Sequence, residues 1–460
     1  MKKLIVLVLL MCAPLHCFAA TYYVDSINGD DSQDGSTSIK AWKTMGNVND
    51  APIKPGDSIL FKRGGVWRGQ LKPRGGSFLG RINYGAYGDG EKPKLLGSVN
   101  ANDGWSDLGK NIWQHTGFSV DVGNIIFDNE KSCGIKVSTE RELNSQGKFW
   151  YDLKNRTLKI YSIGNPSDIY SSIECALNIN YAVCEIADSS YVNINSLDIR
   201  YGGSHGIHSY NAHNIVISDC KVSFCGGGYQ IDTIRYGNGI EINGNANNIV
   251  VEDNIVSDCY DSGITNQGDG NQTNIKILNN IVINCEYSYE FWNSGVGKIV
   301  SNILVVNNTF LNAGEGWGHL RAYKSGTHFM FFNTIALIKD FQFKNNILYE
   351  ATEYSVRWQN ASNVKDVISD YNCFYQTKGC YAWVGQTDKG VSYNWADYIS
   401  DLGQDSNSID QDPLLNVDFT LKSNSPCINK GIGLALITRD FVGTKRPQEG
   451  KVDIGAFERK

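Results

Sequence analysis

The chain has 460 residues, of which 41% are hydrophobic and 20% charged, with 48 Gly and only 9 Pro. This length can bury a large core, and the composition favours many short strands and turns over long helices. The formal net charge of -6 excludes the strongly basic surface that nucleic-acid binding requires, so we expect no nucleic-acid partner.

The first twenty residues read MKKLIVLVLLMCAPLHCFAA. A basic start, an apolar run from Leu4 to Met11 and a small-residue end at Ala19 and Ala20 are typical of a secretory signal peptide, and the run is too short for a membrane anchor. We therefore predict an exported protein, periplasmic or secreted, with a mature domain over residues 21–460 and no membrane insertion.

Two columns of equivalent residues run through the middle of the chain. The first recurs at intervals of 26, 28, 38 and 26 residues and consists of Asn254, Asn280, Asn308, Asn346 and Asn372. The second keeps the same register and consists of Cys225, Cys259, Cys285 and Ala313. Such a period without a helical pattern predicts a solenoid of stacked strand turns. We expect the Asn side chains to hydrogen-bond from turn to turn and the Cys side chains to fill the core instead of forming disulfides.

The repeat divides the mature chain into four parts. We assign residues 21–99 to an N-terminal cap and first turns, 100–174 to a β-rich flank, 175–375 to regular turns and 376–460 to C-terminal loops and cap. Residues 100–174 could form a separate sugar-binding module, but a flank packed on the same domain is the favoured interpretation. Residues 376–410 are expected to form a loop and a short helix.

Both ends of the chain carry a family resemblance. The opening YYVDSINGDDSQDGSTSIKAWKTM with PGDSILFKRGGVWRGQL, and the closing DPLLNVDFTLKSNSPCINKG with VDIGAFE, resemble right-handed parallel β-helix proteins of the pectate lyase superfamily. That superfamily contains glycoside hydrolases, polysaccharide lyases and uronate epimerases. The resemblance implies an all-β right-handed parallel β-helix and a carbohydrate-active enzyme. The signature motifs of polygalacturonases and of the best-known pectate lyases are not recognisable, so the reaction stays open.

One outward-facing column should carry the chemistry. Short segments that follow each turn predict this order of side chains on one face: His208, Glu241, Thr265, Glu290, Arg321 and Arg357. Aromatic residues flank the column, and a mixture of polar groups for sugar hydroxyls with flat rings for sugar faces is typical of a carbohydrate cleft.

Glycoside hydrolysis needs two carboxyl groups, one protonated and one ionised. Neighbouring turns are about 4.8 Å apart, so Glu241 and Glu290 span two turns and Asp261 lies on the turn between them. We take these three as the candidate catalytic residues. The candidate substrate-binding residues are His208, Tyr236, Tyr260, Trp292, His319, Arg321, Lys324, Arg357 and Trp358.

Two other function classes fit the same residues. A polysaccharide lyase or C5-epimerase on a uronate-containing glycan would use Arg321, Lys324 or Arg357 with His208 or His319 as base and charge neutraliser. A non-catalytic glycan-binding protein or adhesin would use the column only as a surface. The expected partner in every case is a polysaccharide or oligosaccharide. No cofactor is required, although calcium could bind at Asp258 and Asp261. The sequence does not specify the sugar, the linkage, endo or exo action, or the oligomeric state.

Overall fold

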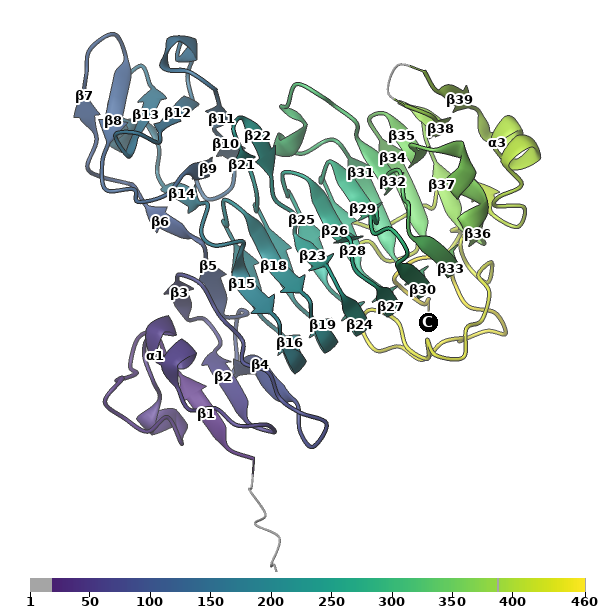
Figure 1. The fold of residues 1–460 in the computed structure, drawn as a ribbon, viewed down its shortest axis with the longest axis horizontal. Coiled ribbons are helices and arrows are strands. Elements are labelled where there is room, and N and C mark those ends of the chain that lie inside the picture. Colours follow the sequence, from purple (N-terminus) through teal and green to yellow (C-terminus); the bar gives the residue numbers. More distant parts are fainter. Residues whose placement is uncertain (1–18, 387–388, 460) are drawn as a thin grey trace, which may run out of the picture.

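Three long sheets of mainly parallel strands form the body of the protein (Figure 1). The computed structural model describes residues 19–386 and 389–459, so the predicted signal peptide falls outside the described residues except at its last two positions. From β15 (Ala182–Ala187) onward, each turn of the chain contributes one strand to each sheet in succession, and strands of successive turns pair in parallel register. The protein is therefore an all-β parallel β-helix, as predicted.

The strands of the three sheets follow in spatial order. Sheet A contains β1 (Thr21–Val24), β2 (Ser58–Lys62), β4 (Ile82–Tyr87), β16 (Ser190–Asn195), β19 (His213–Ser218), β24 (Ala246–Glu252), β27 (Gln272–Leu278), β30 (Ile299–Val306), β33 (Leu337–Lys344) and β36 (Val367–Asp370). Sheet B contains β3 (Val66–Arg68), β5 (Lys94–Leu96), β17 (Asp198–Arg200), β20 (Lys221–Ser223), β25 (Ile255–Ser257), β28 (Ile281–Ile283), β31 (Thr309–Ala313), β34 (Ile347–Ala351), β37 (Cys373–Tyr375) and β40 (Ile409–Asp410). Sheet C contains β15 (Ala182–Ala187), β18 (His205–Tyr210), β23 (Ile240–Asn243), β26 (Ser262–Gln267), β29 (Tyr287–Phe291), β32 (Thr327–Phe331), β35 (Tyr354–Trp358), β38 (Cys380–Val384) and the antiparallel β39 (Val391–Tyr393).

The core lies between the three sheets. Alternate residues of each strand point inward, so Ile249 and Val251 of β24 are buried and stack on Ile275 and Ile277 of β27. No single turn can bury these apolar edges, and stacking removes them from water. Cys225, Cys259 and Cys285 are buried free thiols in this core, as predicted, and no disulfide occurs among the described residues.

The predicted Asn ladder is present at the bend between sheets A and B. Each side-chain amide donates to the Oδ1 atom of the next Asn, at 3.0 Å from Asn254 to Asn280, from Asn280 to Asn308 and from Asn308 to Asn346, and at 3.2 Å from Asn346 to Asn372. Each amide also donates to a backbone carbonyl and accepts from a backbone N–H, as Asn280 does with Val251 and Asn254. The ladder thus satisfies backbone groups that the sharp bend would otherwise leave unpaired in the core.

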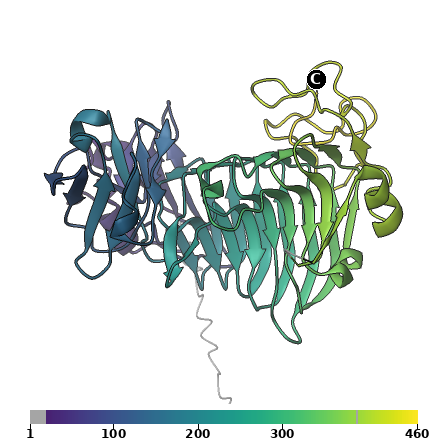
Figure 2. The same cartoon turned by 90° about the horizontal axis from the view of Figure 1, so that it is seen from above.

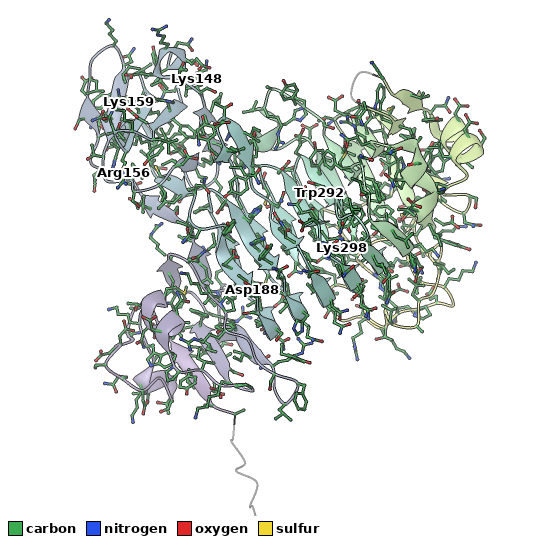
Figure 3. The ribbon with its side chains drawn as sticks, viewed as in Figure 1. Lys148, Arg156, Lys159, Asp188, Trp292 and Lys298 are labelled. Carbon is green, nitrogen blue, oxygen red and sulfur yellow. The ribbon has the colours of Figure 1, made fainter. Side chains whose placement is uncertain are left out.

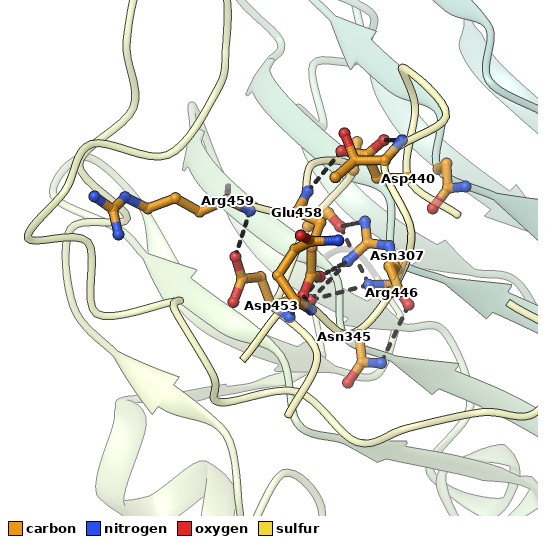
Figure 4. Close-up of polar contacts among 12 residues, drawn as sticks. Asn307, Asn345, Asp440, Arg446, Asp453, Glu458 and Arg459 are labelled. Carbon is orange, nitrogen blue, oxygen red and sulfur yellow. Dashed lines mark hydrogen bonds and ion pairs between the residues drawn. The ribbon is translucent and has the colours of Figure 1, made fainter. Parts of the chain in front are cut away.

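A second Asn column faces outward at the same bend. Asn279, Asn307 and Asn345 precede the ladder residues and have φ values of 51°, 57° and 55°, in the left-handed region that Asn tolerates well. Their amides hold the C-terminal segment: Asn307 donates to the carbonyls of Asp453 and Gly455, and Asn345 to that of Ile432 (Figure 4).

The C-terminal segment, residues 411–459, runs along one side of the later turns (Figure 2). Arg446 is buried in it, donates to Glu458 at 3.0 Å and also donates to the carbonyls of Asp453 and Gly455 (Figure 4). Residues 376–410 extend sheet C with β38 and β39 and add α3 (Trp395–Leu402) at the end of the solenoid.

The flank consists of two small sheets beside the first turns. One contains β6 (Ser98–Asn100), β9 (Val122–Phe127), β10 (Ser132–Cys133) and β14 (Ile173–Leu177); the other contains β7 (Ser106–Asp107), β8 (Ile112–His115), β11 (Ile135–Lys136), β12 (Lys148–Asp152) and β13 (Thr157–Tyr161). The remaining elements are the hairpin of β21 (Gly228–Ile231) and β22 (Ile234–Tyr236), the α-helices α1 (Met45–Asp50) and α2 (Pro166–Ile169), and the 3-10 helices η1 (Ser38–Lys40), η2 (Glu140–Glu142), η3 (Trp317–His319) and η4 (Ala361–Asp366). No described helix is long and apolar enough to span a membrane.

A buried ion pair attaches the flank to the β21–β22 hairpin. Lys136 lies 2.6 Å from the carboxylate of Asp121, which also accepts from the backbone N–H of Tyr229 at 2.8 Å. The ammonium group lies 3.8 Å from the centre of the Tyr229 ring. The flank has a core of its own, but these contacts fix it against the solenoid.

Candidate active site

A pocket of about 990 Å³ opens on the outer face of sheet C. Its floor is formed by β15, β18, β23, β26 and β29, and its walls include Gln70 and Lys72 from the first turns and Gln230 and Tyr236 from the β21–β22 hairpin. Asp188, which directly follows β15, and Trp292, which directly follows β29, belong to the lining (Figure 3). The pocket is thus elongated parallel to the axis of the β-helix.

The strand register places five side chains in one column. Glu185, His208, Glu241, Thr265 and Glu290 pair with one another on successive strands. The next two positions are Met330 and Arg357. The expectation that Arg321 continues the column is therefore wrong. The connection from β31 to β32 contains η3 and is longer than the two before it, from β25 to β26 and from β28 to β29. Arg321 therefore lies in that loop, and the chain re-enters the sheet at Thr327.

The pocket is open at one end and closed at the other. Lys72, Tyr181 and Asp188 are exposed at the end nearest the first turns. At the other end, Glu241 and Glu290 are only 1% and 5% exposed, and Met330, one strand further, is fully buried and does not line the pocket. The three candidate catalytic carboxyl groups therefore lie at the deep end.

Three side-chain amides donate to the carboxylate of Glu241, and His205, whose Nδ1 atom accepts from the backbone N–H of Asn238, lies beside it. The Oε1 atom of Glu241 accepts from Asn243 at 2.7 Å and from Gln267 at 2.8 Å, and its Oε2 atom accepts from Asn238 at 2.8 Å and lies 2.9 Å from Nδ1 of His205. Burial alone would raise the pKa of Glu241, but His205, His208 and Asn243 hold it far below its usual range. Glu241 is consequently ionised, and three donors already occupy its two oxygen atoms.

His208 lies between two carboxylates. Its Nδ1 atom is 3.0 Å from Glu185, and its Nε2 atom is 3.7 Å from Oε1 of Glu241. Burial opposes protonation of the ring, but these contacts prevail and raise the pKa of His208 above its usual value. A protonated His208 balances part of the negative charge at the pocket floor.

Glu290 is in a different environment from Glu241. It accepts a hydrogen bond from the hydroxyl of Ser262, the residue after Asp261. Burial, together with the neighbouring charges of Asp261 and Glu241, raises the pKa of Glu290 to about 8. Glu290 therefore carries a proton at neutral pH.

Asp261 is the most accessible of the three carboxyl groups, with 25% of its side chain exposed. Arg321 donates to its Oδ1 atom at 3.0 Å, and no described residue donates to Oδ2. Burial raises the pKa of Asp261 although Arg321 acts in the opposite direction. Asp261 and Glu290 thus compete for protons at the deep end of the pocket, and only Asp261 has a cation beside it.

Aromatic groups line the walls near these carboxyl groups. Trp292 donates to Oε1 of Gln267 at 2.9 Å, the residue that in turn donates to Glu241. Tyr236 meets the edge of His205, with ring centres 5.0 Å apart, and donates to Asn178. Both rings can contact a sugar while their polar atoms stay hydrogen-bonded to the protein.

The other predicted substrate-binding residues do not line the pocket. Tyr260 is buried between two arginines, His319 pairs with Glu286 at 2.9 Å, Lys324 is exposed on the loop after η3, and Arg357 is 5% exposed and donates to Ser325. Trp358 is fully buried and packs on Phe329 and Phe331. Strand alternation explains the correction for Trp358: its neighbour Arg357 points outward, so Trp358 points into the core.

Several site residues were absent from the sequence-based prediction. Glu185 could have been found by extending the outward column one turn back from His208 in AVCEIA. His205, Asn238, Gln267 and Ser262 carried no comparable signal, because their positions at strand ends and bends do not follow the column.

Calcium does not fit the residues proposed for it. Asp261 is paired with Arg321, and Asp258 accepts from Asn284 outside the pocket. Within the described chain, no group of three or more His, Cys, Asp or Glu side chains has an arrangement that could hold a metal ion.

Comparison with known proteins gives a local sequence similarity and several distant structural ones. No family model matches the chain. Over 103 residues it is 34% identical to a lacto-N-biosidase of Bifidobacterium longum subsp. longum, and this match covers 21% of the chain but only 6% of that protein.

Solved structures similar to this chain include three carbohydrate-active proteins. A glycoside hydrolase has a TM-score of 0.46 at 9% identity, covering 80% of this chain and 95% of its own. Pectate lyase Pel9A has a TM-score of 0.48 at 12% identity, with 96% and 98% coverage. The GH136 lacto-N-biosidase from Eubacterium ramulus has a TM-score of 0.37 at 13% identity, with 80% and 68% coverage.

Proposed function

We propose that this protein is a glycoside hydrolase that binds a polysaccharide or oligosaccharide in the pocket on sheet C. The observation that carries this proposal is that Asp261 and Glu290 both line this pocket, where the charge of Asp261 acts on Glu290 and Arg321 contacts Asp261. Hydrolysis of a glycosidic bond requires such a pair, with one carboxyl group protonated and the other ionised.

The proposed roles follow from the two environments. Glu290 donates its proton to the glycosidic oxygen as the bond to the anomeric carbon breaks, and the leaving sugar departs as an alcohol. Asp261, ionised by Arg321, either attacks the anomeric carbon directly or removes a proton from the water that attacks it. If Asp261 attacks directly, Glu290 then removes a proton from the water that cleaves the glycosyl–Asp261 ester, which returns the proton to Glu290 and frees the Asp261 carboxylate. If Asp261 instead takes the proton of the attacking water, that proton passes through solvent back to Glu290, and either route consumes one water molecule.

Asp261 is a better ionised partner than Glu241. No described residue donates to the Oδ2 atom of Asp261, which can therefore approach a substrate or water, whereas both oxygens of Glu241 already accept from side-chain amides. Strands two apart are also separated by about 10 Å, at or beyond the 6.5–9.5 Å that an inverting pair requires. Glu241 instead keeps His205, Asn238, Asn243 and Gln267 in place as a fixed negative charge in the pocket floor.

The local similarity to a lacto-N-biosidase supports including lacto-N-biosyl compounds among the substrates to be tested. Because the match covers only 6% of that protein, the activity screen, and not the similarity, decides which glycan is the substrate.

A lyase or C5-epimerase is the second candidate, and one contact favours it. His205 lines the pocket and is the candidate base, with its Nδ1 atom 2.9 Å from Glu241 and accepting from the backbone N–H of Asn238 at 3.0 Å. Lys72, at the open end, is the lysine that lines the pocket and could meet a uronate. The described lining contains no arginine to neutralise that carboxylate beside His205, which makes hydrolysis the better-supported reaction.

A binding protein or adhesin without catalysis has less support. A flat exposed face would suit that role, whereas here three carboxyl groups converge at the buried end of a pocket.

The test is an activity screen with two readouts. Purified protein is incubated with neutral and uronate-containing polysaccharides and with aryl lacto-N-biosides, and new reducing ends and unsaturated uronates are followed in parallel. The hydrolase proposal expects reducing ends without unsaturation, and it expects Glu290→Gln and Asp261→Asn to abolish them. If unsaturated products form and are lost in His205→Ala, the protein is a lyase and the hydrolase proposal is wrong.

A further inference from the structure

We propose that Arg321 is a positioning residue that assigns the proton at the deep end of the pocket, keeping Asp261 ionised and Glu290 protonated. This inference rests on the proposed function, because it explains how one of two neighbouring buried carboxyl groups becomes the acid. It also gives Arg321 a role different from the substrate contact expected from the sequence.

The guanidinium group of Arg321 is immobilised. Its Nε donates to the carbonyl of Gly318 at 2.8 Å, Nη2 donates to the carbonyl of Tyr260, and Nη1 donates to Asp261 at 3.0 Å. The group also lies over the Tyr260 ring, 4.0 Å from its centre. With donors directed to three acceptors and one face on a ring, this side chain cannot swing out to bind a sugar, and it does not line the pocket.

The charges around Asp261 show what Arg321 must counter. Glu286 lies on the following turn and His205 on an earlier one, and both interact electrostatically with Asp261, as Glu290 does. Glu286 is itself engaged by His319 at 2.9 Å and by the backbone N–H of Ser325 at 2.6 Å. Arg321 is therefore the cation in direct contact with Asp261, whereas the hydrogen-bond partners of Glu290, Ser262 and Trp292, are neutral.

The loss of Arg321 should move the proton between the two carboxyl groups. An adjacent arginine lowers the pKa of an aspartate by about 1–3 units. Without it, Asp261 is protonated more easily, and Glu290 loses the neighbouring negative charge that opposes its own ionisation. The proton would then lie mainly on Asp261 at neutral pH.

Arg235 supplies a matched control. Its guanidinium group lies over the same Tyr260 ring, 4.3 Å from the centre, and donates to the carbonyls of Gly227 and Gly123. Arg235 and Arg321 thus stack on one ring, but Arg321 alone contacts Asp261. Arg235→Met removes a stacked arginine while leaving the Asp261 ion pair in place.

The experiment measures protonation without substrate. Protein with ¹³C-labelled Asp and Glu carboxyl groups is titrated by NMR, and the signals of Asp261 and Glu290 are assigned with Asp261→Asn and Glu290→Gln. In Arg321→Met, we expect the Glu290 signal to titrate at least one pH unit lower than in the unsubstituted protein and the Asp261 signal to titrate higher. Arg321→Lys and Arg235→Met should both keep the original order.

Two results would overturn the proposal: unchanged titration of both carboxyl groups in Arg321→Met, or an equal shift in Arg235→Met. If Arg321→Met does not fold, Asp261→Asn provides the same test from the other side, because removing its charge should lower the Glu290 titration while Arg321 remains. The titration uses no substrate. An absence of hydrolysis in the activity screen would therefore contradict the hydrolase proposal without contradicting this proton assignment.

Discussion

Glu241 and Glu290 occupy the same position on strands two apart in sheet C, yet their surroundings drive them to opposite protonation states. Glu241 accepts from three side-chain amides and contacts His205, whereas Glu290 has only the neutral partners Ser262 and Trp292 and lies close to other carboxyl groups. The number of donors and the sign of the neighbouring charges separate two chemically identical side chains.

Removal of the proposed acid should affect substrates according to their leaving groups. Glu290→Gln is expected to lower kcat/KM about 10²–10⁴-fold on a glycan, because an alcohol leaves poorly without protonation. The loss should be much smaller on an aryl glycoside, since a phenolate needs little help. Kinetics on both substrates check this, with Glu252→Gln on sheet A as the matched control that should keep full activity. Equal losses on both substrates would contradict the acid role.

The pH profile of kcat/KM should reflect the same two groups. Activity is expected to fall as the pH rises through about 8, because Glu290 then loses the proton it must donate. On the acid side it should fall where Asp261 becomes protonated, at a pH above the usual aspartate range because burial raises its pKa. A rate that stays constant to pH 10 would show that Glu290 is not the acid.

Burial of Glu290 should also make stability depend on pH. Its folded-state pKa of about 8 lies above the ordinary glutamate value of 4.5, so between these values Glu290 is ionised in the unfolded chain but still holds its proton in the folded protein. Folding therefore loses stability as pH rises through this window. Glu290→Gln should remove that loss and give a higher Tm than the unsubstituted protein at pH 9, with little difference at pH 4. A Tm difference that is the same at both pH values would contradict this account.

The Asn ladder should contribute strongly to stability. Asn308→Ala removes a side chain that accepts from the backbone and amide of Asn280 and donates to Ile277 and Asn346, leaving buried polar groups without partners. The expected loss in the free energy of unfolding is about 3 kcal/mol or more. Urea denaturation checks this, and the exposed Asn247→Ala should cost less than about 0.5 kcal/mol. Similar losses for both variants would mean that the ladder has no special role.

The two tryptophans expected at the substrate face should behave differently. Trp292→Ala should raise KM with little loss of stability, because this ring lines the pocket. Trp358→Ala should destabilise the fold by about 3–5 kcal/mol, because this ring is buried among Phe329 and Phe331. Denaturation and steady-state kinetics on both variants separate the two effects. A higher KM in a stably folded Trp358→Ala protein would argue against its placement in the core.

The sequence by itself determined the parts of this protein that repeat. Asn254 and its successors, the buried Cys column and the outward positions of His208, Glu241 and Glu290 all follow from one constraint: side chains alternate along a strand, and stacked turns keep a common register. Equivalent residues in successive turns must therefore meet, and counting along the chain is enough to find them.

Only the tertiary structure determined the positions of the residues in the connections between strands. Connections of different length have no common register, so counting placed Arg321 where Met330 lies and gave no indication that Arg321 would reach back to Asp261. His205 and Gln267 were missed for a related reason, since strand ends and bends do not obey the alternation. The protonation states of Asp261, Glu241 and Glu290 depend on these very contacts, because burial, donors and neighbouring charges are properties of the assembled pocket and not of the residues' spacing.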